Sequence, residues 1–372
     1  MIAVTYGLAR FAYGLFLPEM RESLGLSDLV LGLIGAGSYA GYCLAVIGAL
    51  VFTSRAGPRF MAVAAGAVAV VGMAAVAGAP TAWVLAIGVL VAGSSSGLAS
   101  PPMGEAVATS VPERSRDRAN ALINSGTSVG VALSGSAALL VAERWRAAWV
   151  AFALVGGAVV AWNAVALPRG PVDDEAPGRV AQADVPRLSA RYLVGPGSSP
   201  LFAGATTVGF ASAAYWTFSR DLVVRFGDLS GTGSTVFWVV IGVSGLAGDL
   251  VQRFGLAGAF RASVLSMAAA IGLLGAAPGA PPLAYSSAAL FGSTYIMLTG
   301  IILVWSVSAF PERPSVGLGA AFLLIAVGQV CGALAAGAVA GAVGLAATFW
   351  AFAGIAAAAA LVRPWAEPPS IS

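Results

Sequence analysis

The sequence contains little charge, and two ionisable residue types are missing altogether. Only 9% of its 372 residues are charged, and because lysine and histidine do not occur, all 19 basic residues are arginine. Soluble domains average about 25% charged residues. The formal net charge of +3 and the lack of a basic run argue against a nucleic-acid partner. The missing histidine removes a common general base and a common metal ligand.

Cysteines and cofactor motifs are also scarce. The two cysteines, Cys43 and Cys331, lie in apolar runs, where we expect packing residues and no disulfide. Residues 93–97 fit G-x-S-x-G, but a nucleophile elbow needs a strand-turn-helix and a histidine base. No phosphate-binding loop, haem motif or metal-ligand cluster occurs in the sequence. The sequence therefore predicts no enzyme, no catalytic residue, no metal and no cofactor.

Apolar residues dominate instead, at 59% of the chain, together with 48 glycines. A helix needs about 20 apolar residues to cross a bilayer, and Gly-Pro, Ala-Pro and Pro-Glu-Arg breaks divide the chain into twelve such spans. They cover 1–20, 29–52, 59–78, 81–108, 118–141, 147–167, 198–222, 233–252, 256–277, 282–309, 315–340 and 343–362. The predicted fold is an all-α integral membrane protein with twelve transmembrane helices in a lipid bilayer, and no cleavable signal peptide is expected.

The arginines predict the orientation of the chain. With both ends inside, most arginines outside the spans fall in cytoplasmic segments, as the positive-inside rule requires. The inside set is Arg55, Arg59, Arg114, Arg116, Arg118, Arg169, Arg179, Arg187, Arg191, Arg253, Arg261, Arg313 and Arg363, whereas Arg21, Arg144, Arg146 and Arg225 are outside. We therefore expect a cytoplasmic-membrane protein with both termini cytoplasmic. The Arg and Ala bias is compatible with a bacterial source.

The first predicted span recurs in the second half of the chain. Its Gly7, Ala9, Ala12, Tyr13 and Phe16 reappear at one constant offset as Gly209, Ala211, Ala214, Tyr215 and Phe218. Arg10, the one charge within 1–18, falls on Ser212. We expect two pseudosymmetric six-helix bundles, an N-terminal one at 1–167 and a C-terminal one at 198–362. A cytoplasmic linker at 168–197 joins them, and 363–372 forms a short cytoplasmic tail. Parallel repeats of this kind are an alternating-access transporter layout.

Two loops point to a known family. The segment at 248–255 reads G-D-L-V-Q-R-F-G and resembles the cytoplasmic loop G-x-L-x-D-R-x-G of the major facilitator superfamily of secondary transporters, with Gln252 in place of the aspartate. The equivalent loop of the first half, between 48 and 59, matches less well. In the family this loop latches the halves through a charge network. The resemblance implies that switching role for Gly48, Arg55, Gly57, Gly248, Asp249, Arg253 and Gly255.

A third signature lies in the predicted span at 118–141. Residues 126–135 read G-T-S-V-G-V-A-L-S-G and resemble the exporter motif G-x-x-x-G-P-x-x-G-G. The matching positions are Gly126, Gly130 and Gly135, with Ser134 in place of a glycine. The resemblance favours a drug-efflux-like branch. Close packing of a neighbouring helix would also explain glycines at this spacing, and both interpretations stay open.

Arg10 and Glu105 are the charges that the first half has and the second half lacks. A mid-span arginine costs several kcal/mol unless it faces protein or water, so Arg10 is predicted to face a central cavity. Glu105 lies roughly 10 Å inside the end of its span at 1.5 Å per residue. We hypothesise that the two form a cavity-facing pair whose protonation couples to transport. Alternatively, Glu105 meets interfacial water and pairs with Arg114 or Arg118.

Further polar and aromatic side chains complete the predicted pathway. They are Tyr13, Asn124, Ser212, Tyr215, Trp216 and Tyr295. Trp and Tyr near the end of a span are often interfacial anchors; the alternative is an aromatic wall for an apolar or cationic solute. The remaining polar groups serve either interhelical hydrogen bonds or contacts to a substrate.

Taken together, the sequence predicts a secondary active transporter that moves a small organic solute across the cytoplasmic membrane. Without a nucleotide motif, an ion gradient would supply the energy, and we expect protons or another coupling ion, efflux rather than uptake, and a monomer. A proton-coupled uptake symporter for a metabolite is the alternative within this class. A membrane sensor or scaffold that transports nothing is the alternative from another class.

Overall fold

The computed structural model describes residues 1–141, 144–167, 198–227, 229–246, 255–310 and 314–363. Within these ranges the side chains of 50–58, of 314–315 and of several residues between 101 and 121, Glu105 among them, are not described. The regular secondary structure of the described part is entirely helical, which confirms the predicted fold class.

The helices follow the predicted spans closely. In chain order they are η1 (Ala3–Phe11), α1 (Ala12–Leu24), α2 (Asp28–Ala77), α3 (Ala82–Ser110), α4 (Glu113–Val141), α5 (Trp145–Ala166), α6 (Ser198–Phe226), α7 (Thr232–Gly245), α8 (Gly255–Ala276), α9 (Pro281–Ala309), α10 (Pro314–Val343), α11 (Leu345–Ala358) and η4 (Ala359–Leu361). The loop expected to hold Gly248, Asp249 and Arg253 lies outside the described residues. Gly255, the last residue of that motif, begins α8 with a φ of 65°.

The first span is two helical elements in series. Residues Ala3–Phe11 form a π-helix that passes directly into α1. Short π segments are frequent at functional sites because they reposition the side chains of one turn. Arg10 stands in this π segment. The helix ends at Gly25, whose φ of 63° is a left-handed conformation that glycine adopts without strain.

The expected loop between the second and third spans is helical in backbone conformation. One helical element runs through Asp28–Ala77, so Gly48, Arg55 and Gly57 all lie inside α2. The element nevertheless turns back on itself. A Cβ on Gly41 would meet Leu90, and a Cβ on Gly72 would meet Ala92. In a straight helix Gly41 and Gly72 would lie about 46 Å apart at 1.5 Å per residue. The two arms of α2 therefore pack beside α3, as two spans should.

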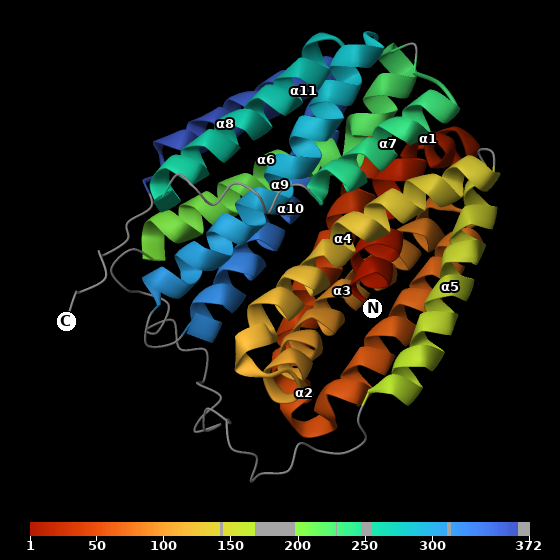
Figure 1. Ribbon diagram of the computed structural model, residues 1–372. Coiled ribbons are helices and arrows are strands. Elements are labelled where there is room, and N and C mark those ends of the chain that lie inside the picture. The colour runs from red at the N-terminus through yellow and green to blue at the C-terminus, as the bar shows by residue number, and fades with distance from the viewer. Residues whose placement is uncertain (142–143, 168–197, 228, 247–254, 311–313, 364–372) are drawn as a thin grey trace.

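The helices form two groups that face each other (Figure 1). The first group runs from η1 to α5 and the second from α6 to η4. Contacts between the groups come in equivalent pairs: Gly32 of α2 approaches Gly337 of α10, and Gly242 of α7 approaches Ala132 of α4. In each contact the second predicted span of one half meets the fifth predicted span of the other half. A two-fold relation between the halves produces this pairing. Small residues allow the backbones to come this close.

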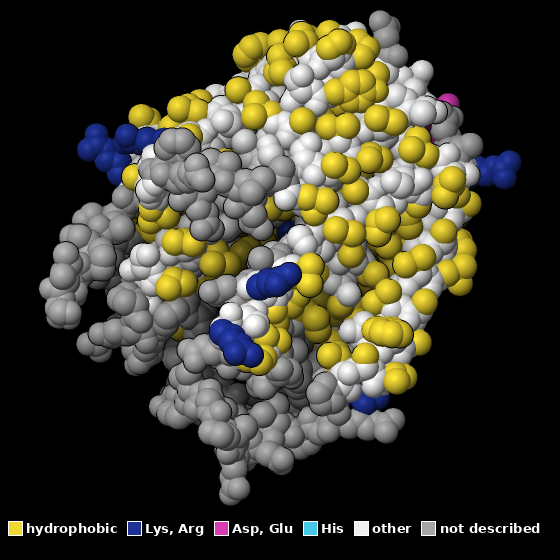
Figure 2. Space-filling model, viewed as in Figure 1, with side chains coloured by type: hydrophobic (Ala, Val, Ile, Leu, Met, Phe, Trp, Pro, Cys, Tyr) yellow, Lys and Arg dark blue, Asp and Glu magenta, His cyan; other side chains and the backbone are white. Residues whose placement is uncertain are grey.

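Long apolar helices and apolar outer surfaces are typical of a membrane protein. Among the described residues, seven segments have the length and composition to cross a membrane. These segments are Asp28–Ala49, Arg59–Ala77, Ala82–Ser100, Trp145–Ala166, Gly255–Ala276, Pro281–Ala309 and Val316–Val343. On the outside of the bundle, Leu140 is 86% exposed and Trp162 is 74% exposed. Figure 2 shows such apolar side chains spread over the visible face with few charges among them.

Candidate functional site

A cavity of about 150 Å³ lies between the two groups of helices. Its described lining comes from η1, α2, α3 and α4 of the first group and from α7, α9 and α10 of the second. About 10–15 Å³ of such space holds one water molecule, so the cavity has room for a small organic molecule. Along the first span, Ile2, Tyr6 and Arg10 line it, whereas Leu15 and Leu17 beyond Arg10 are fully buried. The cavity thus ends at Arg10.

Arg10 joins the two halves at the end of this cavity. Its side chain is 6% exposed, and its Nη2 donates a hydrogen bond to Gln329 Oε1 of α10 at 2.8 Å. Gln329 is itself fully buried and donates through Nε2 to the hydroxyl of Tyr295 on α9 at 3.1 Å. A chain of hydrogen bonds therefore runs from Arg10 on η1 through Gln329 on α10 to Tyr295 on α9. The prediction that Arg10 turns into the protein agrees with this geometry.

Aromatic rings surround the Arg10 guanidinium. The guanidinium carbon lies 4.2 Å from the ring centroid of Tyr42 and 5.0 Å from that of Tyr39, both on α2. The rings of Phe11 and Tyr6 follow at 5.4 and 5.5 Å. Each ring within about 6 Å attracts a cation through its quadrupole, by roughly 0.5–2 kcal/mol. These four rings lower the cost of holding the cation at depth.

No carboxylate whose side chain the structure describes pairs with Arg10, and its Nε has no hydrogen-bond partner. Buried charges ordinarily carry a partner of opposite sign. The aromatic rings and one amide oxygen supply partial negative charge, but they leave the positive charge uncancelled. Among the described residues, the cavity therefore ends in a buried cation without an acidic partner.

The Tyr6 hydroxyl lies within hydrogen-bond distance of Ser100 Oγ on α3, at 2.7 Å. It also donates a long bond to the Tyr42 hydroxyl at 3.5 Å. The Tyr6–Ser100 contact fixes the register of η1 against α3. Arg10 lies about one turn after Tyr6 on η1, and Glu105 lies five residues after Ser100 on α3. Because the two helices are antiparallel, these two steps lead in opposite directions from the Tyr6–Ser100 contact. That register leaves an interval on the order of 10 Å between the two residues along the helix axis.

The Glu105 side chain lies outside the described residues, so the pair with Arg10 stays a prediction. Of the six other predicted pathway residues, four line one of two pockets. Asn124 and Tyr295 line the main cavity. Tyr13 and Trp216 line a smaller pocket of about 10 Å³, which Arg10 also borders on the side away from the main cavity. Ser212 is buried and donates to the Gly209 carbonyl at 2.9 Å.

Tyr215 is a core residue in this structure. It is fully buried, its hydroxyl lies 2.8 Å from Ser287 Oγ, and its ring stacks on Phe291 at 3.8 Å between centroids. Its counterpart Tyr13 instead donates a hydrogen bond to the Leu31 carbonyl at 2.9 Å. The two copies of the repeat therefore use the same tyrosine for different contacts.

The exporter-like motif packs α4 against both groups. Gly126 meets Ile2, and Gly130 meets Ala3 and Gly7, where any Cβ would collide with backbone. At the other end of the motif, Ser134 accepts a hydrogen bond from Trp238 Nε1 at 3.2 Å, and Gly135 meets Val239. Gly130, Ser134 and Gly135 of the motif thus serve close packing between helices. Its meaning for the direction of transport stays a prediction.

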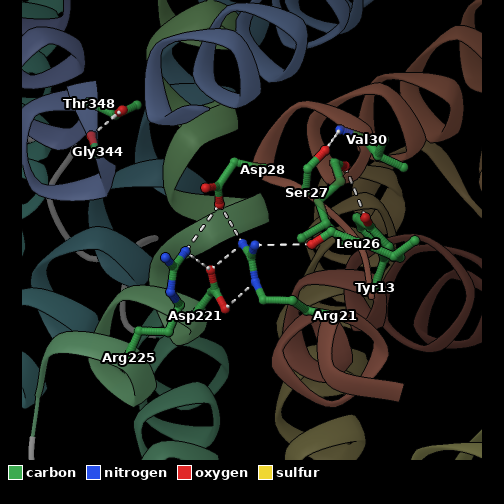
Figure 3. A network of polar contacts seen from close by, with 11 residues as sticks. Tyr13, Arg21, Leu26, Ser27, Asp28, Val30, Asp221, Arg225, Gly344 and Thr348 are labelled. Atoms are coloured by element: carbon green, nitrogen blue, oxygen red, sulfur yellow. Dashed lines mark hydrogen bonds and ion pairs between the residues drawn. The ribbon is translucent and has the colours of Figure 1, made fainter. Parts of the chain in front are cut away.

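The far end of the first span carries a cluster of ion pairs between the halves (Figure 3). Arg21 of α1 donates through Nε and Nη2 to both carboxylate oxygens of Asp221 on α6, at 3.2 and 2.7 Å. Arg21 also pairs with Asp28 at 2.5 Å, and Arg225 bridges Asp28 and Asp221 at 3.2 and 3.5 Å. Beside them, Arg220 pairs with Glu19 at 2.7 Å. We name these six residues the outer ion-pair cluster.

The acids of this cluster stabilise the positive charge on Arg21. Arg21 lies just beyond the predicted span at 1–20. Burial lowers its pKa, but hydrogen bonds and charge from Asp221 and Asp28 outweigh that effect and raise the pKa above its usual value. Asp221 is fully buried, so its charge depends on these arginines. The sequence offered no signal for the cluster, because its members come from the ends of spans that are distant in the chain.

Comparison with known proteins places the chain in a recognised group. Residues 1–328 match the family model described as Major Facilitator Superfamily. A bacterial homologue of the human lysosomal transporter Spinster, inward-facing and occupied, is similar in fold, with 14% identity, a TM-score of 0.78 and coverage of 99% of this chain and 97% of that chain. The nucleoside transporter NupG shows 13% identity, a TM-score of 0.76 and coverage of 97% and 96%.

The xylose transporter XylE from E. coli, in an inward open conformation, shows 15% identity, a TM-score of 0.76 and coverage of 100% of this chain and 96% of that chain. At these identities the likeness shows the fold alone. No curated protein matches the sequence.

Proposed function

Because the chain belongs to the Major Facilitator Superfamily and is a transporter rather than an enzyme, we propose that it moves a small organic solute by secondary active transport through the cavity beside Arg10. The observation that carries this proposal is the Arg10–Gln329 hydrogen bond at the end of the cavity. A solute that competes for Arg10 breaks a bond between the halves. Binding would then change how the halves are held together, as alternating access requires.

The conformation also supports a transport cycle. The cavity extends from Arg10 toward Ile2 and Leu303, near the helix ends that the arginines assign to the cytoplasm. The outer ion-pair cluster holds the halves together at the opposite end. We take this as the inward-facing state of the transporter, with the N-terminal bundle at 1–167 and the C-terminal bundle at 198–362 as the moving bodies. The polar segment 168–197 would be their cytoplasmic linker.

Proton-coupled efflux is the finer part of the proposal. Glu105 is the acid of α3 that would carry the proton, and the motif at 126–135 favours export. Uptake by symport uses the same cavity and differs only in the direction of coupling. A membrane sensor would use the same cavity to bind its ligand, so a flux measurement separates the two functions.

Flux across reconstituted vesicles tests the proposal. We expect purified protein in proteoliposomes to move a member of a solute library when a pH gradient is imposed, and to stop when the gradient is collapsed by an ionophore. Gradient-dependent accumulation on the external side establishes efflux, and the reverse establishes uptake. The absence of any protein-dependent flux across the library, from correctly folded protein, would contradict the proposal.

The proposed orientation has its own test. In a variant without Cys43 and Cys331, single cysteines at positions 175 and 370 should react with an impermeant thiol reagent only after the cells are opened. A cysteine at Arg144, which the arginine pattern puts outside, is the matched control and should react in intact cells. Labelling of position 175 or 370 in intact cells would refute the orientation.

A further inference from the structure

Resting on the proposed transport function, we propose that the cavity binds a small organic carboxylate, with its two oxygens on Arg10 and an apolar or aromatic body in the cavity. Three features of the described residues support this: Arg10 has no described acidic partner, its buried Nε has no hydrogen-bond partner, and aromatic rings already occupy the faces of its guanidinium.

Among the described lining residues, the charge balance calls for one negative charge. Arg10 is the one charged side chain among the described residues that line it, and these include no acid. A monoanion would neutralise the site, whereas a dianion would bring one charge too many into a buried position. A cationic solute would meet Arg10 without any carboxylate to offset the repulsion. Electrostatics thus select for a singly charged anion.

The molecule itself shows how a carboxylate fits an arginine. At the outer ion-pair cluster, Arg21 uses Nε and Nη2 to hold both oxygens of Asp221. Arg10 presents the same edge, but there Nη2 is bonded to Gln329 Oε1 and Nε has no partner. The amide of Gln329 supplies one oxygen where a carboxylate supplies two. A solute carboxylate that replaces Gln329 would complete the fork that Arg21 already makes with Asp221.

The aromatic residues around Arg10 argue against a cationic solute. Four rings within about 6 Å would form a cage for an ammonium group. That cage is already filled, because the guanidinium of Arg10 lies against Tyr42, Tyr39, Phe11 and Tyr6. Apolar side chains also line the cavity, among them Ile325 and Phe322 on the same helix, α10, as Gln329. The cavity therefore offers an anion site next to an apolar wall.

Three isosteric probes separate charge from shape. Benzoate, benzamide and benzamidine have the same planar outline and carry charges of −1, 0 and +1 at neutral pH. We expect calorimetric titration of the purified protein to show benzoate binding at least tenfold more tightly than benzamide, with benzamidine weakest. Benzamide or benzamidine binding as tightly as benzoate, or no benzoate binding at millimolar concentration, would overturn the proposal.

Two variants assign the preference to Arg10. Arg10→Gln should bind benzoate no better than benzamide, while Arg261→Gln, which removes an exposed arginine on α8, should keep the wild-type preference. Gln329→Glu is the second variant and places a carboxylate on Arg10 from within the protein. It should raise the melting temperature and abolish benzoate binding. If Gln329→Glu still binds benzoate like the wild type, Arg10 is not the anion site.

The binding result is distinguishable from the transport result. A protein that prefers benzoate through Arg10 but moves no solute in proteoliposomes supports the anion site and contradicts transport. A protein that moves neutral or cationic solutes under a pH gradient, with no benzoate preference, supports transport and overturns the anion site.

Discussion

Arg10 and Arg21 stand on the same first span but have opposite surroundings. Arg21 holds Asp221 in a two-oxygen fork and pairs with Asp28 as well. Arg10 has one amide oxygen, four ring faces and an unpartnered Nε. A satisfied arginine joins parts of a protein, whereas an unsatisfied one at the end of a cavity has room for a ligand. We infer that the first span closes the molecule at Arg21 and binds solute at Arg10.

The largest expected effect comes from making the same substitution at both positions. Arg10→Met should lower solute flux by at least 100-fold, which corresponds to about 2.7 kcal/mol, and should lower the melting temperature less than Arg21→Met, because no described acid loses a partner. Arg21→Met should lower the melting temperature more, since it leaves Asp221 buried with only Arg225 at 3.5 Å.

Melting curves and flux measurements on the two variants check this. Equal losses of stability would show that Arg10 has a hidden acidic partner, with Glu105 the first candidate. Unchanged flux in Arg10→Met would remove Arg10 from the solute pathway.

Glu105→Gln should flatten the dependence of flux on the pH gradient while leaving exchange of solute for solute intact. The amide keeps the shape of the side chain and loses the proton that would couple to transport. Initial rates at several external pH values, with and without a gradient, measure the effect. Glu113→Gln, at the start of α4, is the matched control and should retain the gradient dependence. Wild-type pH dependence in Glu105→Gln would exclude the coupling role.

Asp221→Asn tests whether the ion pair between Arg21 and Asp221 holds the halves together. The substitution leaves Arg21 and Arg225 close together with Asp28 as their remaining described acid. Breaking a fully buried pair costs about 3–5 kcal/mol; because Arg21 is 18% and Arg225 35% exposed, we expect about 2 kcal/mol. The halves should separate more readily at this end, which lowers the melting temperature. The double variant Arg21→Gln with Asp221→Asn should recover part of the loss. A melting temperature equal to the wild type would show that the cluster does not hold the halves together.

The sequence predicted the parts of the molecule that depend on the length of apolar runs and on the free-energy cost of burying a charge in the membrane. Spans of about 20 apolar residues gave the helices to within a few residues, as at 256–277 for α8. The high cost of a mid-span arginine placed Arg10 toward the interior. The helical turn within α2 was not predicted, because the polar stretch around Arg55 looked like a loop.

The partners of Arg10 could not be predicted, because they depend on the register between distant helices. Tyr39 and Tyr42 reach it from the second span and Gln329 from the eleventh, and local periodicity does not fix those contacts. Gln329 offered one usable signal, because it is a polar amide side chain within an apolar run, beside Gly328. The sequence places Tyr215 on the pathway as an aromatic side chain near the end of its span, whereas Ser287 and Phe291 hold it in the core.

The smallest expected effect concerns the rings that replace a carboxylate at Arg10. Tyr42→Leu removes the nearest ring face, at 4.2 Å from the guanidinium carbon, and should cost about 1–2 kcal/mol of stability. Tyr42→Phe keeps the face and loses only a 3.5 Å hydrogen bond from Tyr6, so it should stay close to the wild type. Leucine also packs less well than tyrosine, and a double-mutant cycle with Arg10→Met separates the two contributions. If the rings stabilise the cation, the difference between the Leu and Phe variants should shrink once Arg10 is methionine. A difference of the same size in both backgrounds would mean that Tyr42 only fills space, and that Arg10 is held by Gln329 alone.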